Sequence, residues 1–134
     1  MVVSALSPAV SWELNKIQAE QMCNAFRDGL PLETVTTSTY ENNRLKAWDI
    51  LHGKKTITVK SPKTYAFYRN LLLDVDSVTV DRWMLRVMFN RPLKSLTALK
   101  YRQCETILAQ CANDLDLQPF QLQAITWEQI RQEA

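Results

Sequence analysis

Hydrophobic residues recur along this chain at helical spacing. Between Ser7 and Gly29 an apolar residue returns every three to five positions, at Leu14, Ile17, Met22 and Phe26. No window shows the sustained alternation of apolar and polar residues that a half-buried strand needs. The pattern therefore predicts an amphipathic helix in this segment and an all-α protein.

Start and stop signals divide the rest of the chain into five further helices. Ser61 followed by Pro62 is typical of a helix start, because a hydroxyl can cap the helix and proline fits its first position. Asp74–Ser77 is a polar break. The five helices are expected near residues 45–53, 62–73, 80–89, 96–115 and 119–127. We expect a compact helical domain of about six helices that spans residues 1–134 as a single domain.

Charge is distributed unevenly along the chain, although the net charge is only +2. Residues 1–40 hold 2 basic and 4 acidic side chains, residues 41–102 hold 13 and 5, and residues 103–134 hold 1 and 5, giving −2, +8 and −4. A basic segment of this kind can form the positive face of a nucleic-acid binder. The alternative is an ordinary solvated surface.

The cysteine and histidine content limits the cofactors that the chain can hold. Its 3 cysteines, Cys23, Cys104 and Cys111, lack CxxC spacing, and its only histidine is His52. We expect the cysteines to be buried free thiols. A zinc site built from the chain's own residues and a four-cysteine iron–sulfur cluster are both excluded. We expect no metal site and no cofactor.

Targeting and membrane signals are also missing from the sequence. No stretch approaches the roughly 20 apolar residues of a membrane helix, and the start MVVSALSP has no basic region or cleavage site for export. We therefore expect a cytoplasmic protein that does not bind membranes.

The most informative stretch is residues 57–87, ITVKSPKTYAFYRNLLLDVDSVTVDRWMLRV. It resembles the helix-hairpin-helix DNA glycosylases such as endonuclease III, which carry LPGVGxKTA, an apolar helix and then VDxHVxRV. The matching pairs in this chain are Lys63–Thr64, Val80–Asp81 and Arg86–Val87. The chain looks closest to an uncharacterised phage and plasmid branch of that superfamily, in which VTVD and a terminal QAITW recur.

The resemblance implies a glycosylase-like fold, a duplex DNA partner and catalysis by Asp81 and Lys63. Both residue types suit cleavage of an N-glycosidic bond, because a carboxylate stabilises the positively charged sugar and an amine can attack it to form a Schiff base. The implied enzyme is a DNA N-glycosylase, with abasic-site lyase activity if the amine attacks. Asp81 has an alternative role as the acid that completes a helix cap, and Lys63 as a solvated lysine.

Candidate DNA contacts surround this pair in the basic segment. Polar side chains at the hairpin and basic side chains can meet phosphates, whereas a tyrosine and an asparagine in or next to a loop can touch a base. The candidates are Lys54, Lys55, Lys60, Ser61, Thr64, Arg82, Tyr40 and Asn43. For Arg86 we favour an ion pair with an acid of the 74–77 break, and for the four tryptophans packing in the core.

Three departures from the family pattern keep other functions open. Val59 and Ser61 replace the hairpin glycines that let backbone N–H groups approach a phosphate, and Trp83 replaces the histidine after the aspartate. One alternative is a DNA-binding module that has lost the chemistry. Another is a protein-interaction adaptor that works through the acidic C-terminal helices.

Overall fold

The computed structural model describes residues 1–90 and 96–133, and these fall into two compact units. Unit 1 comprises Met1–Thr58 and unit 2 comprises Val59–Ala134. The expectation of a single domain over residues 1–134 stays a prediction.

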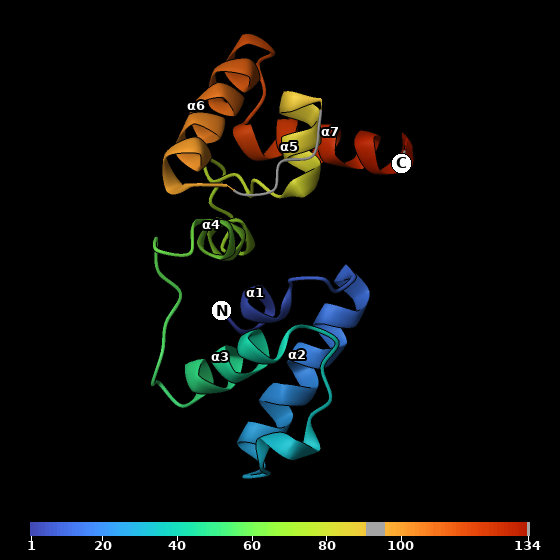
Figure 1. The fold of residues 1–134 in the computed structure, drawn as a ribbon, viewed down its shortest axis with the longest axis vertical. Coiled ribbons are helices and arrows are strands. Elements are labelled where there is room, and N and C mark those ends of the chain that lie inside the picture. The colour runs from blue at the N-terminus through green and yellow to red at the C-terminus, as the bar shows by residue number, and fades with distance from the viewer. Residues whose placement is uncertain (91–95, 134) are drawn as a thin grey trace. The chain divides into compact units, whose positions relative to one another are not determined.

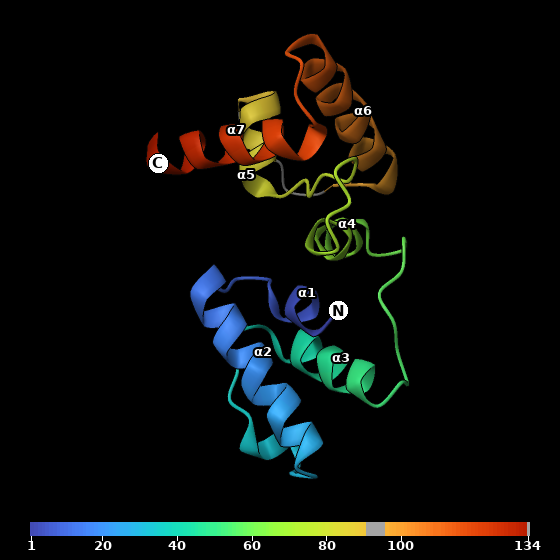
Figure 2. The same cartoon turned by 180° about the vertical axis from the view of Figure 1, so that it is seen from behind.

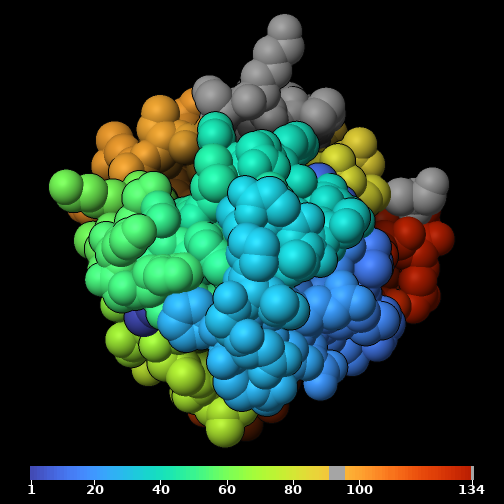
Figure 3. Space-filling view, turned by 90° about the horizontal axis from the view of Figure 1, so that it is seen from below, coloured from blue at the N-terminus to red at the C-terminus, as the bar shows by residue number. Residues whose placement is uncertain are grey.

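Unit 1 is built from three α-helices and one turn of 3₁₀ helix in its described chain (Figure 1). They are α1 (Val2–Leu6), α2 (Trp12–Arg27), η1 (Leu32–Thr34) and α3 (Glu41–Leu51). Helix α1 packs against both α2 and α3, and the segment between α2 and α3 lies over the end of α2, in cyan in Figure 3. The core of unit 1 therefore forms around the short α1, whose residues Ala5 and Leu6 are buried.

The face that α2 buries differs from the one that its apolar residues predict. Of the four predicted positions only Met22 is buried. Leu14, Ile17 and Phe26 are exposed, whereas Asn15 and Gln18 are buried. The Asn15 amide donates to the carbonyl oxygen of Val3 at 3.1 Å, and Gln18 exchanges two hydrogen bonds with Ser38. Burial of a polar side chain is tolerated when it is hydrogen-bonded, so partners far away in sequence decided this orientation.

Unit 2 consists of four α-helices, α4 (Pro62–Leu71), α5 (Arg82–Phe89), α6 (Ala98–Asp114) and α7 (Pro119–Glu133). Helix α7 packs against both α5 and α6, and Figures 1 and 2 show α5 and α7 crossing. The core joins α4, the chain before α5, and helices α5 to α7. Its buried residues are Ala66, Val78, Val80, Met84, Leu85, Tyr101, Cys104, Leu108, Ala112 and Leu122.

The all-α prediction is confirmed, since the described residues form seven α-helices and no strand. The helix predicted from Val80 begins instead at Arg82, because residues 78–80 are not helical. The helix predicted from Pro8 begins at Trp12, and Ser11 caps it. The N-terminal α1 is the additional element.

Several expected core positions are exposed. Cys104 is buried, and burial raises the pKa of its thiol, but Cys23 and Cys111 are exposed free thiols. Trp12 is also 48% exposed, whereas the other three tryptophans are partly buried. None of the described helices has the length and apolar character needed to cross a membrane.

Candidate functional site

The three residues that precede Asp81 are held by side chains from two distant helices. Tyr101 of α6 donates its hydroxyl to the carbonyl oxygen of Val78 at 2.9 Å and accepts from the N–H of Val80 at 3.1 Å. Gln123 of α7 accepts from the N–H of Thr79 at 2.8 Å and donates to its carbonyl oxygen at 3.0 Å. These side chains satisfy backbone N–H and C=O groups of residues 78–80 that would otherwise lack partners, and they fix the backbone that leads into α5.

Helix α4 contributes a third side chain to the same segment. The Thr79 hydroxyl donates to Asn70 at 3.0 Å, and the Asn70 amide donates to the carbonyl oxygens of Asp74 and Ser77. One asparagine therefore ties the end of α4, the polar break and the segment before α5 together. None of Asn70, Tyr101 and Gln123 stood out as a site residue in the sequence.

Asp81 is the N-cap of α5, and both of its carboxylate oxygens accept hydrogen bonds. Oδ1 accepts from the backbone N–H groups of Trp83 at 2.9 Å and Met84 at 3.0 Å. Oδ2 accepts from the indole N–H of Trp127 at 3.2 Å. The side chain is only partly buried. Asp81 is thus a rigidly placed carboxylate on a residue that is not fully buried.

Trp127 and Gln123 give the terminal QAITW motif a structural meaning. Gln123 binds Thr79 and Trp127 binds Asp81, so the two ends of this motif hold two residues of VTVD. The two motifs therefore form one structural unit, although Trp127 and Asp81 lie 46 positions apart in sequence.

Lys63 and the other candidates at the start of α4 lie in unit 2 with Asp81. Lys63 is exposed, and within the described chain no ion pair or hydrogen bond joins it to Asp81. Ser61 is the N-cap residue of α4, but its hydroxyl makes no capping hydrogen bond, so that part of the prediction is wrong. Thr64 is partly buried and Lys60 is exposed.

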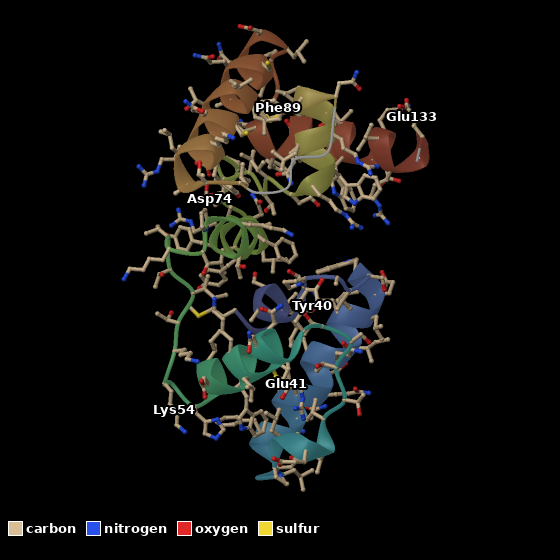
Figure 4. The ribbon with its side chains drawn as sticks, viewed as in Figure 1. Tyr40, Glu41, Lys54, Asp74, Phe89 and Glu133 are labelled. Carbon is tan, nitrogen blue, oxygen red and sulfur yellow. The ribbon has the colours of Figure 1, made fainter. Side chains whose placement is uncertain are left out.

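The remaining DNA-contact candidates lie in unit 1, around α3. Tyr40, at the start of α3, is 66% exposed, and Lys54 lies beyond the other end (Figure 4). Asn43 is partly buried in the first turn. Lys55 pairs with Asp49 at 2.9 Å, and this hydrogen bond holds the pKa of Asp49 below its usual value. These four side chains and those of unit 2 therefore belong to different units.

Arg82 and Arg86 make cation–π contacts with Trp83 and do not pair with an acidic side chain of the described residues. Their guanidinium carbons are 5.2 Å and 4.9 Å from the centroid of the Trp83 ring. The ion pair favoured for Arg86 is absent, because Asp74 instead pairs with Arg69 at 2.6 Å. This hydrogen bond lowers the pKa of Asp74. In the described part of the chain, neither Arg82 nor Arg86 lies within 4.0 Å of a carboxylate.

A second arginine–tryptophan pair comes from α7. The guanidinium carbon of Arg131 is 4.4 Å from the centroid of Trp127, the residue that binds Asp81. Because α5 packs against α7, the two pairs belong to neighbouring helices. We call the five side chains the arginine–tryptophan cluster: Arg82, Trp83, Arg86, Trp127 and Arg131. Only Arg82 was a candidate from the sequence.

Two surface hollows of the described chain lie away from Asp81 and Lys63. One is in unit 1, between α1 and α2, and the other is in unit 2, around the turn from α6 to α7. Neither includes Asp81 or Lys63. These hollows are therefore not a pocket for a nucleotide on which Asp81 acts.

Comparison with known proteins gives a family without an assigned activity. No curated protein and no solved structure matches the chain significantly. The match that covers residues 1–134 is to the family described as "Family of unknown function (DUF7178)". Because this match extends over the whole chain, the protein belongs to that family.

Proposed function

We propose that this chain binds DNA and that Asp81 stabilises the positively charged sugar formed when the N-glycosidic bond of an extruded nucleotide breaks. The observation that carries the proposal is the fixed carboxylate of the partly buried Asp81, held by three hydrogen bonds from α5 and α7. A charge that is already in position needs no reorganisation as the opposite charge develops, which makes it effective in catalysis. A carboxylate has more acceptor sites than these three bonds occupy.

DNA binding is the first part of the proposal to test. A duplex oligonucleotide labelled with a fluorophore is titrated at a series of salt concentrations. Each neutralised phosphate adds about −0.9 to the slope of log affinity against log salt, so three or more contacts predict a slope of about −3 or steeper. A flat response, or no binding at low salt, would contradict the proposal and favour the adaptor alternative.

Lys63 is the amine proposed to attack the sugar. It is exposed, and among the described residues it pairs with no carboxylate, so no ion pair has to break before its deprotonated amine attacks the sugar. Attack at the anomeric carbon would expel the base with the bonding electrons, and loss of a proton from the amine and opening of the sugar ring would then give a Schiff base. Without this attack, water would take the same position.

Borohydride trapping distinguishes attack by Lys63 from attack by water. Incubation of the wild type with abasic DNA and borohydride is expected to leave a covalent protein–DNA adduct, which Lys63→Ala abolishes. Lys100→Ala, which removes another exposed lysine of unit 2, should leave the adduct unchanged. An adduct that survives Lys63→Ala, or none at all with the wild type, would exclude Lys63 as the nucleophile.

The second candidate function is a DNA-binding module without chemistry. One observation favours it, because the two hydrogen bonds from the N–H groups of Trp83 and Met84 already make Asp81 the N-cap of α5. Salt-dependent binding together with no release of any base, from duplexes that contain mismatched, damaged or modified bases, would select this candidate.

A further inference from the structure

We propose that the arginine–tryptophan cluster is a phosphate-binding surface, which contacts the nucleic-acid backbone without reading the base sequence. This inference rests on the proposed DNA binding and names the surface and the type of contact. Its three guanidinium groups come from Arg82 and Arg86 of α5 and from Arg131 of α7.

The charge of these arginines is available to a partner. All three side chains are exposed, and no carboxylate of the described residues lies within 4.0 Å of any of them. Helix α5 itself contains no acidic residue. By contrast, Arg69 in the same unit is neutralised by Asp74. No arginine of the cluster therefore forms an ion pair with a described carboxylate.

The tryptophans restrict the arginines before any partner arrives. A guanidinium over an indole is attracted by the ring quadrupole, by about 0.5–1 kcal/mol at an exposed site. Trp83 holds two of the three guanidinium groups and Trp127 holds the third. A side chain that is already ordered loses less entropy on binding, so these contacts raise the affinity for an anion.

The arginine–tryptophan cluster suits contacts with phosphates better than contacts with bases. Both indoles are partly buried, each has an arginine over its ring, and the N–H of Trp127 is used by Asp81. They serve as supports for arginines and not as open platforms for stacked bases. Guanidinium groups bind phosphate oxygens in a bidentate geometry, and such contacts carry no sequence information.

The test measures affinity and its salt dependence for two duplexes of unrelated sequence. Arg82→Ala, Arg86→Ala and Arg131→Ala should each weaken binding to both duplexes equally and reduce the salt slope by about 1. The triple variant should lose about 3 from the slope. Arg102→Ala, which removes an exposed arginine of α6, is the matched control and should bind as the wild type does.

Trp83→Leu tests whether the indole contributes to binding. If only the positive charge of the arginines mattered, this substitution would not change the affinity. It keeps all three arginines but removes the ring under two of them, so we expect a several-fold loss of affinity with an almost unchanged salt slope. Trp83→Phe retains a ring and should recover part of the affinity. Thermal melting of every variant verifies that the fold is intact.

The outcomes distinguish this inference from the proposed function. If the wild type binds DNA and the triple variant keeps its affinity and slope, the surface is wrong and DNA binding stands. If the variants lose binding to one duplex sequence only, the arginines read bases and the inference fails. If the wild type binds vesicles of anionic phospholipid but no DNA, both proposals are overturned.

Discussion

Replacement of Asp81 by asparagine is expected to reduce base release by about 10²–10³-fold and to leave DNA affinity nearly unchanged. The substitution removes the negative charge that would face the cationic sugar, and loss of a single electrostatic contact to a developing charge has effects of this size in other enzymes. The cap survives, since asparagine can still accept from the N–H groups of Trp83 and Met84. The measurement is the single-turnover rate of base release, alongside a binding titration.

A control is needed because asparagine also changes the contact with Trp127. In the wild type, Oδ2 of Asp81 accepts from the indole N–H at 3.2 Å. If the amide N–H₂ of asparagine takes the place of Oδ2, two hydrogen-bond donors face each other. Trp127→Phe removes the same hydrogen bond and keeps both the ring and the Asp81 charge. It should slow base release far less than Asp81→Asn does. If both variants slow base release equally, the hydrogen bond from Trp127 and not the charge of Asp81 accounts for the effect. If Asp81→Asn releases the base as fast as the wild type, Asp81 is only a helix cap.

The helices could be predicted from local sequence, and the site only in part. Helix α4 begins at Pro62, and α7 begins at Pro119, as the proline positions indicated. Both signals act within one turn of helix, so they are visible in a short window. The face of α2 was not predictable in this way, because Asn15 and Gln18 are buried through hydrogen bonds to Val3 and Ser38.

The same limit applies to the site. Asp81 was visible as an acid at a helix entrance, but its partner Trp127 is 46 positions away. Polarity patterns show neither such a contact nor the cation–π pairs of Arg86 and Arg131, which replaced the expected ion pair. Trp83 lies three positions before Arg86, but polarity alone does not distinguish an arginine stacked on an aromatic ring from one that pairs with an acid of the 74–77 break.

Replacement of Tyr101 by phenylalanine is expected to cause a large loss of stability in unit 2. Tyr101 is only 3% exposed, and its hydroxyl binds the carbonyl oxygen of Val78 and the N–H of Val80. Phenylalanine fills the space but leaves both backbone groups unpaired, at a cost of about 1–3 kcal/mol for each. Chemical denaturation at neutral pH measures the loss. Tyr68→Phe removes a hydroxyl that binds no described residue and should have little effect.

The pH dependence gives this prediction a second, independent readout. Burial raises the pKa of Tyr101 above its ordinary value near 10. An acid whose pKa is raised by folding stabilises the fold fully below the pKa of the unfolded chain, and this contribution is lost as pH rises from about 10 toward the folded value. The difference in unfolding free energy between wild type and Tyr101→Phe should therefore be constant below about pH 9 and shrink above about pH 10. A difference that stays constant to about pH 11 would mean that the hydroxyl is not buried. Because residues 78–80 lead directly into Asp81, Tyr101→Phe should also slow base release at neutral pH, where the protein remains folded.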